Sequence, residues 1–104
     1  MSKHDARTQL IEFLERRAFN PVLHASGKDN GELADLKRRT ETEIERFRNY
    51  GSAHDVVVNF RRDLTSEPAK KIHRRLAAQD LPTLPDLRED FEQLVQRLGV
   101  EGKQ

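Results

Sequence analysis

The side chains that could do chemistry are concentrated between residues 61 and 75, where basic residues outnumber acidic ones. This stretch holds two acidic residues and six basic ones, which are Arg61, Arg62, Lys70, Lys71, Arg74 and Arg75. At about 100° per residue, the last four share one arc of a helix, opposite the apolar side chains of the same helix. Such a strip could bind the phosphates of a nucleic acid, with an affinity that falls steeply as salt rises.

Two other interpretations of this basic face stay open. It could be a solvated helix face that balances the acidic C-terminal part, because residues 80–104 hold six acids and three bases. It could also bind an acidic protein partner. The dibasic pairs Arg16-Arg17 and Arg38-Arg39 fall on other predicted helices, and periodicity does not tell whether they join the same surface.

Two predicted helices meet near Thr65, which raises the possibility of a helix-turn-helix. A recognition helix reads bases mainly with its N-terminal residues, and here these are Glu67, Pro68 and Ala69. Glu67 would repel phosphate, and no aromatic residue lies among the basic ones to stack on single-stranded bases. Any nucleic-acid binding should therefore use backbone contacts, with weak sequence specificity.

The other reactive side chains do not form a recognisable catalytic or metal-binding pattern. The four histidines (His4, His24, His54 and His73) include no pair at the i,i+3 or i,i+4 spacing of helical metal ligands. His73 lies at the border of a predicted buried stripe, which favours a boundary residue over a general base. We therefore expect no bound metal and no cofactor.

Paired carboxylates are equally well explained without catalysis. Glu41 and Glu45 share a helix face, but Lys37 and Arg48 lie one turn away from them and favour surface ion pairs. Serine and threonine residues fall mainly at predicted helix caps, and no nucleophile, base and orienting group can be assembled from them. We therefore expect a protein that is not an enzyme.

Composition predicts one small domain over residues 1–104, with frayed ends at residues 1–4 and 101–104. Nineteen Lys and Arg against eighteen Asp and Glu give no strong overall attraction to nucleic acid or membranes. The absence of cysteine excludes disulfides and thiolate chemistry and fits a reducing compartment. No apolar run approaches the roughly 20 residues that span a bilayer. We therefore expect a cytoplasmic protein without membrane contact.

Apolar side chains recur at helical spacing in five stretches. The predicted helices cover residues 5–18, residues 32–50, a segment from a Ser52 cap to Leu64, a segment from a Thr65 or Ser66 cap to about Gln79, and a segment from Thr83 to Gly99. Pro21 should stop or kink the first helix, and Gly51 fits the C-cap of the second. Residues 24–31 read as a loop, and residues 56–58, three consecutive valines, leave a β-strand as an alternative to helix.

The last helix carries the richest apolar stripe, so we expect the other helices to fold around it. The stripe consists of Leu84, Leu87, Phe91, Leu94, Val95 and Leu98. The sequence therefore predicts an all-α fold, a single small helical bundle of about five helices with short capped loops.

For function we carry two hypotheses. The first is a small non-enzymatic interaction module that binds a protein partner or associates with itself. The second is weakly specific nucleic-acid binding through the basic face at residues 61–75.

Overall fold

The structure is a computed structural model that describes residues 5–26 and 31–100. Its elements are α1 (Ala6–Leu14), the π-helical segment η1 (Glu15–Phe19), α2 (Asn20–Leu23), α3 (Gly31–Arg48), α4 (Ala53–Thr65), α5 (Glu67–Ala78), the 3₁₀ turn η2 (Pro85–Leu87) and α6 (Arg88–Leu98). Because α1, η1 and α2 follow without a break, the described residues form five helices and no strand. The all-α prediction is confirmed, and the valine run at residues 56–58 is helical. The predicted frayed ends and residues 27–30 of the predicted loop lie outside the described residues.

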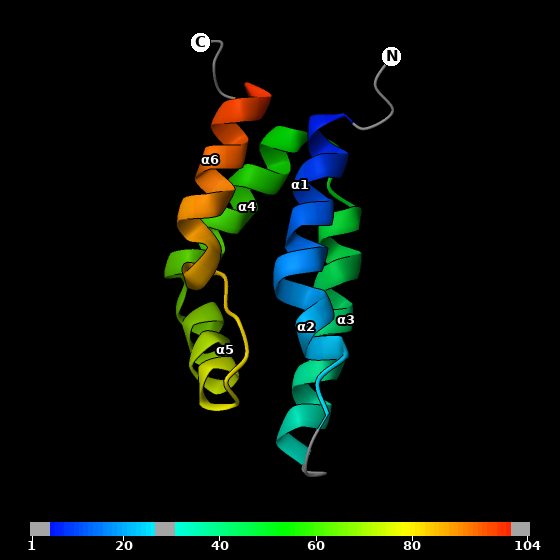
Figure 1. The fold of residues 1–104 in the computed structure, drawn as a ribbon, viewed down its shortest axis with the longest axis vertical. Coiled ribbons are helices and arrows are strands. Elements are labelled where there is room, and N and C mark those ends of the chain that lie inside the picture. Colours follow the sequence, from blue (N-terminus) through cyan, green and yellow to red (C-terminus); the bar gives the residue numbers. More distant parts are fainter. Residues whose placement is uncertain (1–4, 27–30, 101–104) are drawn as a thin grey trace.

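The helices form two halves that are joined mainly at one end of the molecule (Figure 1). The first half is the run α1–η1–α2, which lies beside α3, and the second half contains α4, α5 and α6. Helix α1 packs against both α4 and α6, while η1 packs against α3. The molecule is elongated, with extents of 46 × 28 × 21 Å, so α2, the start of α3 and α5 extend away from that junction.

Two hydrophobic clusters follow from this arrangement. The larger one fills the junction, and its fully buried side chains include Leu10, Leu14, Phe47, Phe60 and Phe91. The smaller one lies toward the other end and contains Val22, Leu36 and Leu76, with Ile72 and Leu81 packed against it.

The apolar stripe of the last helix is largely buried, but that helix is not the centre of the fold. Leu84, Leu87, Phe91 and Val95 are buried, and the Phe91 ring stacks on Phe60 with centroids 3.8 Å apart. Leu94 and Leu98 are only partly buried, at the edge of the larger cluster. The first helical run is the more central element, because α1 contacts α4 and α6 of the second half and η1 contacts α3 of its own half.

Two helix starts follow the predicted capping residues. Ser52 accepts a hydrogen bond from the Asp55 N–H at 3.1 Å, and Ser66 accepts one from the Ala69 N–H at 3.3 Å. The predicted start of the last helix at Thr83 is wrong, because a 3₁₀ turn begins at Pro85 and α6 only at Arg88, neither with a side-chain cap. The Asp86 carboxylate does accept from the Thr83 N–H at 3.0 Å, as in one half of a capping box.

Of the two predicted effects of Pro21 on the first helix, a stop or a kink, the stop is wrong. The chain stays helical through Pro21 to Leu23, and a π-helical segment precedes the proline. Within it the Asn20 N–H donates to the Glu15 carbonyl, an i→i+5 bond. Pro21 then stands in the first turn of α2, where its missing N–H costs little.

The prediction that Gly51 caps the second helix is also wrong. Helix α3 ends at Arg48, and Gly51 has no positive φ. The guanidinium of Arg7 donates instead to the carbonyls of Arg48 and Tyr50. A distant arginine therefore satisfies the free carbonyls at the end of α3, which a sequence pattern cannot reveal.

A candidate binding cleft between helices α3 and α5

The structure divides the six basic residues of the predicted face into paired and unpaired ones. Arg61 forms a two-pronged ion pair with Glu92 of α6, with N–O distances of 2.8 and 2.6 Å. Arg75 does the same with Glu32 of α3 at 2.6 and 2.8 Å, and also contacts Asp35. These two arginines already have carboxylate partners, so the predicted strip is interrupted by acids.

The remaining basic residues are more available. Lys70 lies 3.7 Å from Glu67, a loose pair one turn away on the same helix. Arg62, Lys71 and Arg74 are exposed, and within residues 5–26 and 31–100 none of them forms an ion pair. Lys71 and Arg74 line a concave surface that a ligand could occupy, whereas Arg62 lies on α4 and lines neither pocket.

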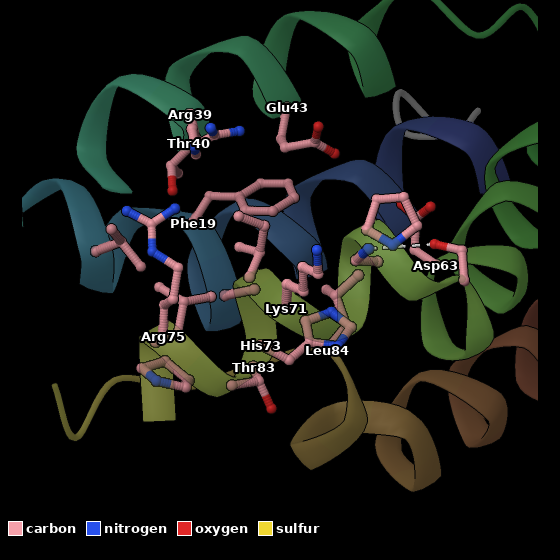
Figure 2. A pocket seen from close by; sticks show the side chains of 18 of the residues that line it. Phe19, Arg39, Thr40, Glu43, Asp63, Lys71, His73, Arg75, Thr83 and Leu84 are labelled. Atoms are coloured by element: carbon pink, nitrogen blue, oxygen red, sulfur yellow. Dashed lines mark hydrogen bonds between the residues drawn. The ribbon is translucent and has the colours of Figure 1, made fainter. Parts of the chain in front are cut away.

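A half-open cleft of about 600 Å³ lies between α3 and α5 (Figure 2). Its floor is apolar and is formed by Phe19, Val22, Ile72, Leu76 and Leu84. These floor residues come from η1, α2, α5 and the segment after α5, and α3 contributes polar side chains such as Thr40 and Glu43. The volume and the apolar lining with a few polar groups are typical of ligand-binding pockets.

Arg46 closes the end of the cleft that lies nearer the large hydrophobic cluster. Its guanidinium donates to the Asp63 carboxylate at 2.6 Å, and also to Glu43. The same group lies over the rings of Phe47 and Tyr50, at 4.9 and 5.8 Å from their centroids. Burial opposes the charge on Arg46, but the hydrogen bonds to the two carboxylates outweigh it and raise the pKa of Arg46.

Arg75 spans the cleft at its other end. We call Arg75 with Glu32 and Asp35 the Arg75 clasp, and it joins α5 to the start of α3. Hydrogen bonds from Arg75 and then from Arg39 hold the pKa of Asp35 at about 2, and the Arg75 bond lowers the pKa of Glu32. Figure 2 shows the Arg75 side chain reaching from α5 toward Thr40 on the α3 wall.

Lys71 lies between these two ends. Its side chain extends from α5 into the cleft toward Phe19 (Figure 2). Lys71 and Arg75 also line a second, shallower hollow of about 420 Å³, together with Glu32, Arg74 and Gln79. The cleft and the hollow therefore adjoin, and together they follow α5 along its whole length.

His73 supplies a buried polar atom in the wall of the cleft. Its Nδ1 atom is buried and has no hydrogen-bond partner among the residues that the structure describes. Burial lowers the pKa of His73, with Asp63 and Asp86 acting in the opposite direction. The neutral imidazole is therefore favoured, as the predicted boundary position of this residue suggests.

Sequence reasoning placed four basic residues on α5 but did not find the cleft. Its walls come from residues far apart in the chain, such as Phe19, Thr40 and Leu84. One signal was present: Thr40 interrupts the apolar stripe of α3 and is buried, 7% exposed. The π-helical segment at Ala18 and Phe19 is another local sign, because such segments occur frequently at functional sites.

In the part of the chain that the structure describes, no group of three or more His, Cys, Asp or Glu side chains could hold a metal ion. Over the same residues, each helix is too short or too polar to cross a lipid bilayer. No protein-family model matches the chain, and neither a curated protein nor a solved structure shows significant similarity to it.

Proposed function

We propose that the protein is a small, non-enzymatic interaction module that takes a segment of a protein partner into the cleft between α3 and α5. The observation that carries the proposal is the apolar floor of a half-open, 600 Å³ cleft. Each Å² of apolar surface that a partner buries there would contribute about 25 cal/mol of favourable free energy to binding. The absence of cysteine fits a reducing compartment, and we propose a cytoplasmic location.

The shape of the cleft supports a protein segment as the ligand. Cleft and hollow follow α5, whose 12 residues span about 18 Å at 1.5 Å per residue. A trough of this length and lining suits two or three anchoring side chains of a peptide. A nucleic acid is a poorer fit, because its unbroken row of phosphates would have to pass Glu32, Asp35 and Glu67, whereas a peptide can place its few charged side chains away from these acids.

A matched pair of substitutions on α5 tests this proposal. Ala69 lines the cleft and Ala77 is exposed outside it, so Ala69→Leu fills the cleft while Ala77→Leu adds the same group elsewhere. Peptides of 12 residues are selected by phage display on the folded protein, and their affinities are measured by fluorescence anisotropy. We expect about tenfold weaker binding to Ala69→Leu, equivalent to about 1.4 kcal/mol, and unchanged binding to Ala77→Leu.

Three outcomes would contradict the proposal. The first is that no peptide is enriched, or that enriched peptides bind both variants alike. The second is tight binding of mixed-sequence DNA or RNA with a steep inverse salt dependence, which would favour the nucleic-acid hypothesis. The third is a dimer, seen by light scattering, that Ala69→Leu abolishes and Ala77→Leu does not. That result would assign the cleft to a second copy of the chain.

A further inference from the structure

The Arg46 end of the cleft and the adjoining hollow differ in charge. At the Arg46 end, one guanidinium is shared by two carboxylates, Glu43 and Asp63. An additional acidic group from a ligand would be repelled there, because Arg46 is already hydrogen-bonded to both acids and to the Tyr50 hydroxyl. This end of the cleft therefore disfavours acidic ligands.

The hollow and the part of the cleft next to it favour acidic ligands instead. The charge of Arg75 is neutralised by Glu32 and Asp35, and that of Lys70 faces Glu67. Lys71 and Arg74 remain, one turn apart on α5 and both lining the hollow, without an ion-pair partner in the described parts of the chain. An acidic side chain placed over them would gain two charge-assisted contacts beside an apolar surface.

The backbone of the ligand also has to be accommodated. The walls are helices whose backbone groups bond within their own helices, so the cleft has no sheet edge that an extended strand could join. An amphipathic helix satisfies its own backbone groups and presents apolar side chains at i, i+3, i+4 and i+7. It is therefore the form of peptide that this cleft can bind without unsatisfied hydrogen bonds.

We infer that the partner segment is an acidic amphipathic helix, bound with its apolar side chains on the cleft floor and its carboxylates over Lys71 and Arg74. The inference rests on the proposed function and adds the chemistry and orientation of the partner. The carboxylates belong at the hollow end of the bound helix, away from Glu43 and Asp63.

The experiment uses two synthetic helical peptides with fluorescent labels. Both carry leucines at i, i+3, i+4 and i+7. One has glutamates and the other lysines along the last turn.

The protein variants are Lys71→Glu and Arg62→Glu, which change the net charge equally. Arg62 is exposed near the end of α4 and lines neither the cleft nor the hollow. Circular dichroism confirms that both variants remain helical.

We expect the glutamate peptide to bind the unmodified protein at least about tenfold more tightly than the lysine peptide. Lys71→Glu should reverse this preference, and Arg62→Glu should leave it in place. Equal affinities of the two peptides, or equal effects of the two charge reversals, would overturn the inference. If in addition Ala69→Leu weakens both peptides alike, the proposed function survives and only the acidic partner is lost. If neither peptide binds and phage selection enriches none, both fail.

Discussion

At the residue scale, His73 makes the stability of the protein depend on pH. Its buried Nδ1 atom has no hydrogen-bond partner within residues 5–26 and 31–100, and burial lowers the pKa of His73 below the ordinary 6.5. The folded state therefore holds a proton on His73 less tightly than the unfolded state does. The stability linked to the neutral ring is complete above pH 6.5 and is lost as the pH falls through that value toward the lowered pKa.

Replacing His73 by leucine removes this dependence. Urea unfolding of the unmodified protein should show a falling free energy of unfolding between pH 7 and pH 5, and His73→Leu should show a smaller fall. Measurement at pH 8, where the neutral ring dominates in both states, serves as the internal control. Identical slopes for the two proteins between pH 7 and pH 5 would contradict the assigned role of His73.

Residue positions that depend on helical periodicity could be predicted from the sequence, and pairings between distant helices could not. The place of His73 at the edge of a buried stripe follows from helical periodicity, and the side chain is half-buried. Periodicity also placed Arg75 on the outer arc of α5. Its partner Glu32 is 43 positions earlier in the chain, so the pairing depends on how α3 and α5 pack.

At the scale of elements, the end of α5 contains a strained residue. Asp80 has a φ of 62°, the left-handed conformation that usually belongs to glycine. The Leu81 N–H donates to the Leu76 carbonyl at 3.0 Å, and the Asp80 N–H to the Ala77 carbonyl at 2.9 Å. This is a Schellman motif, and Leu81 completes it by packing in the smaller cluster with Leu76.

Glycine at position 80 should stabilise the protein. The left-handed conformation costs a non-glycine residue on the order of 1 kcal/mol, and the greater freedom of glycine in the unfolded chain offsets part of that gain. Asp80→Gly should therefore raise the free energy of unfolding by a few tenths to about 1 kcal/mol, measured by urea denaturation. Gln79→Gly is the matched control, because Gln79 has a φ of −99° and should lose stability. A loss of stability in Asp80→Gly would refute this account.

Helix starts were predictable where a single side chain decides them. Ser52 and Ser66 bond to backbone groups within three residues, so their effect is visible in the sequence. The end of α3 was not predictable, because Arg7 caps it from 41 residues away. Helix boundaries that depend on residues close in the sequence were predictable, and those that depend on tertiary packing were not.

At the scale of the whole molecule, the Arg75 clasp links the two halves beside the smaller hydrophobic cluster of Val22, Leu36 and Leu76. Hydrogen bonds with Arg75 and Arg39 lower the pKa of Asp35 from its ordinary 3.8 to about 2. The folded protein therefore releases the Asp35 proton more readily than the unfolded chain does. The stability from this carboxylate is complete above about pH 4 and is lost as the pH falls toward 2.

An Asp35→Asn variant should be less stable than the unmodified protein at pH 6 and should lose less stability between pH 4 and pH 2. The difference at pH 6 should shrink at high salt, because the clasp is partly exposed to solvent. Urea unfolding across this range measures both effects. Glu41→Gln alters an exposed acid of the same helix outside the clasp and should behave as the unmodified protein does. Equal acid sensitivity of Asp35→Asn and the unmodified protein would contradict a role for the clasp.

The fold class followed from the sequence, because five amphipathic stretches with caps have few alternatives to a helical bundle. The cleft did not follow, because it lies where α5 stands apart from the middle of α3, at Arg39, Thr40 and Glu43. Which helix faces remain apart depends on the relative orientation of the two halves. Helical periodicity in one sequence does not predict that orientation.

The π-helical segment has a consequence for how the first helix keeps one side buried. Leu10, Leu14, Ala18 and Val22 recur at intervals of four and are all buried. In a regular helix with 3.6 residues per turn, each step of four advances the side chain by about 40°, so Val22 would be displaced from Leu10 by about 120°. The i→i+5 bond of Glu15 adds a residue to one turn and reduces this drift. That single residue acts as a phase correction, which lets one helix contribute first to the large cluster and then to the cleft.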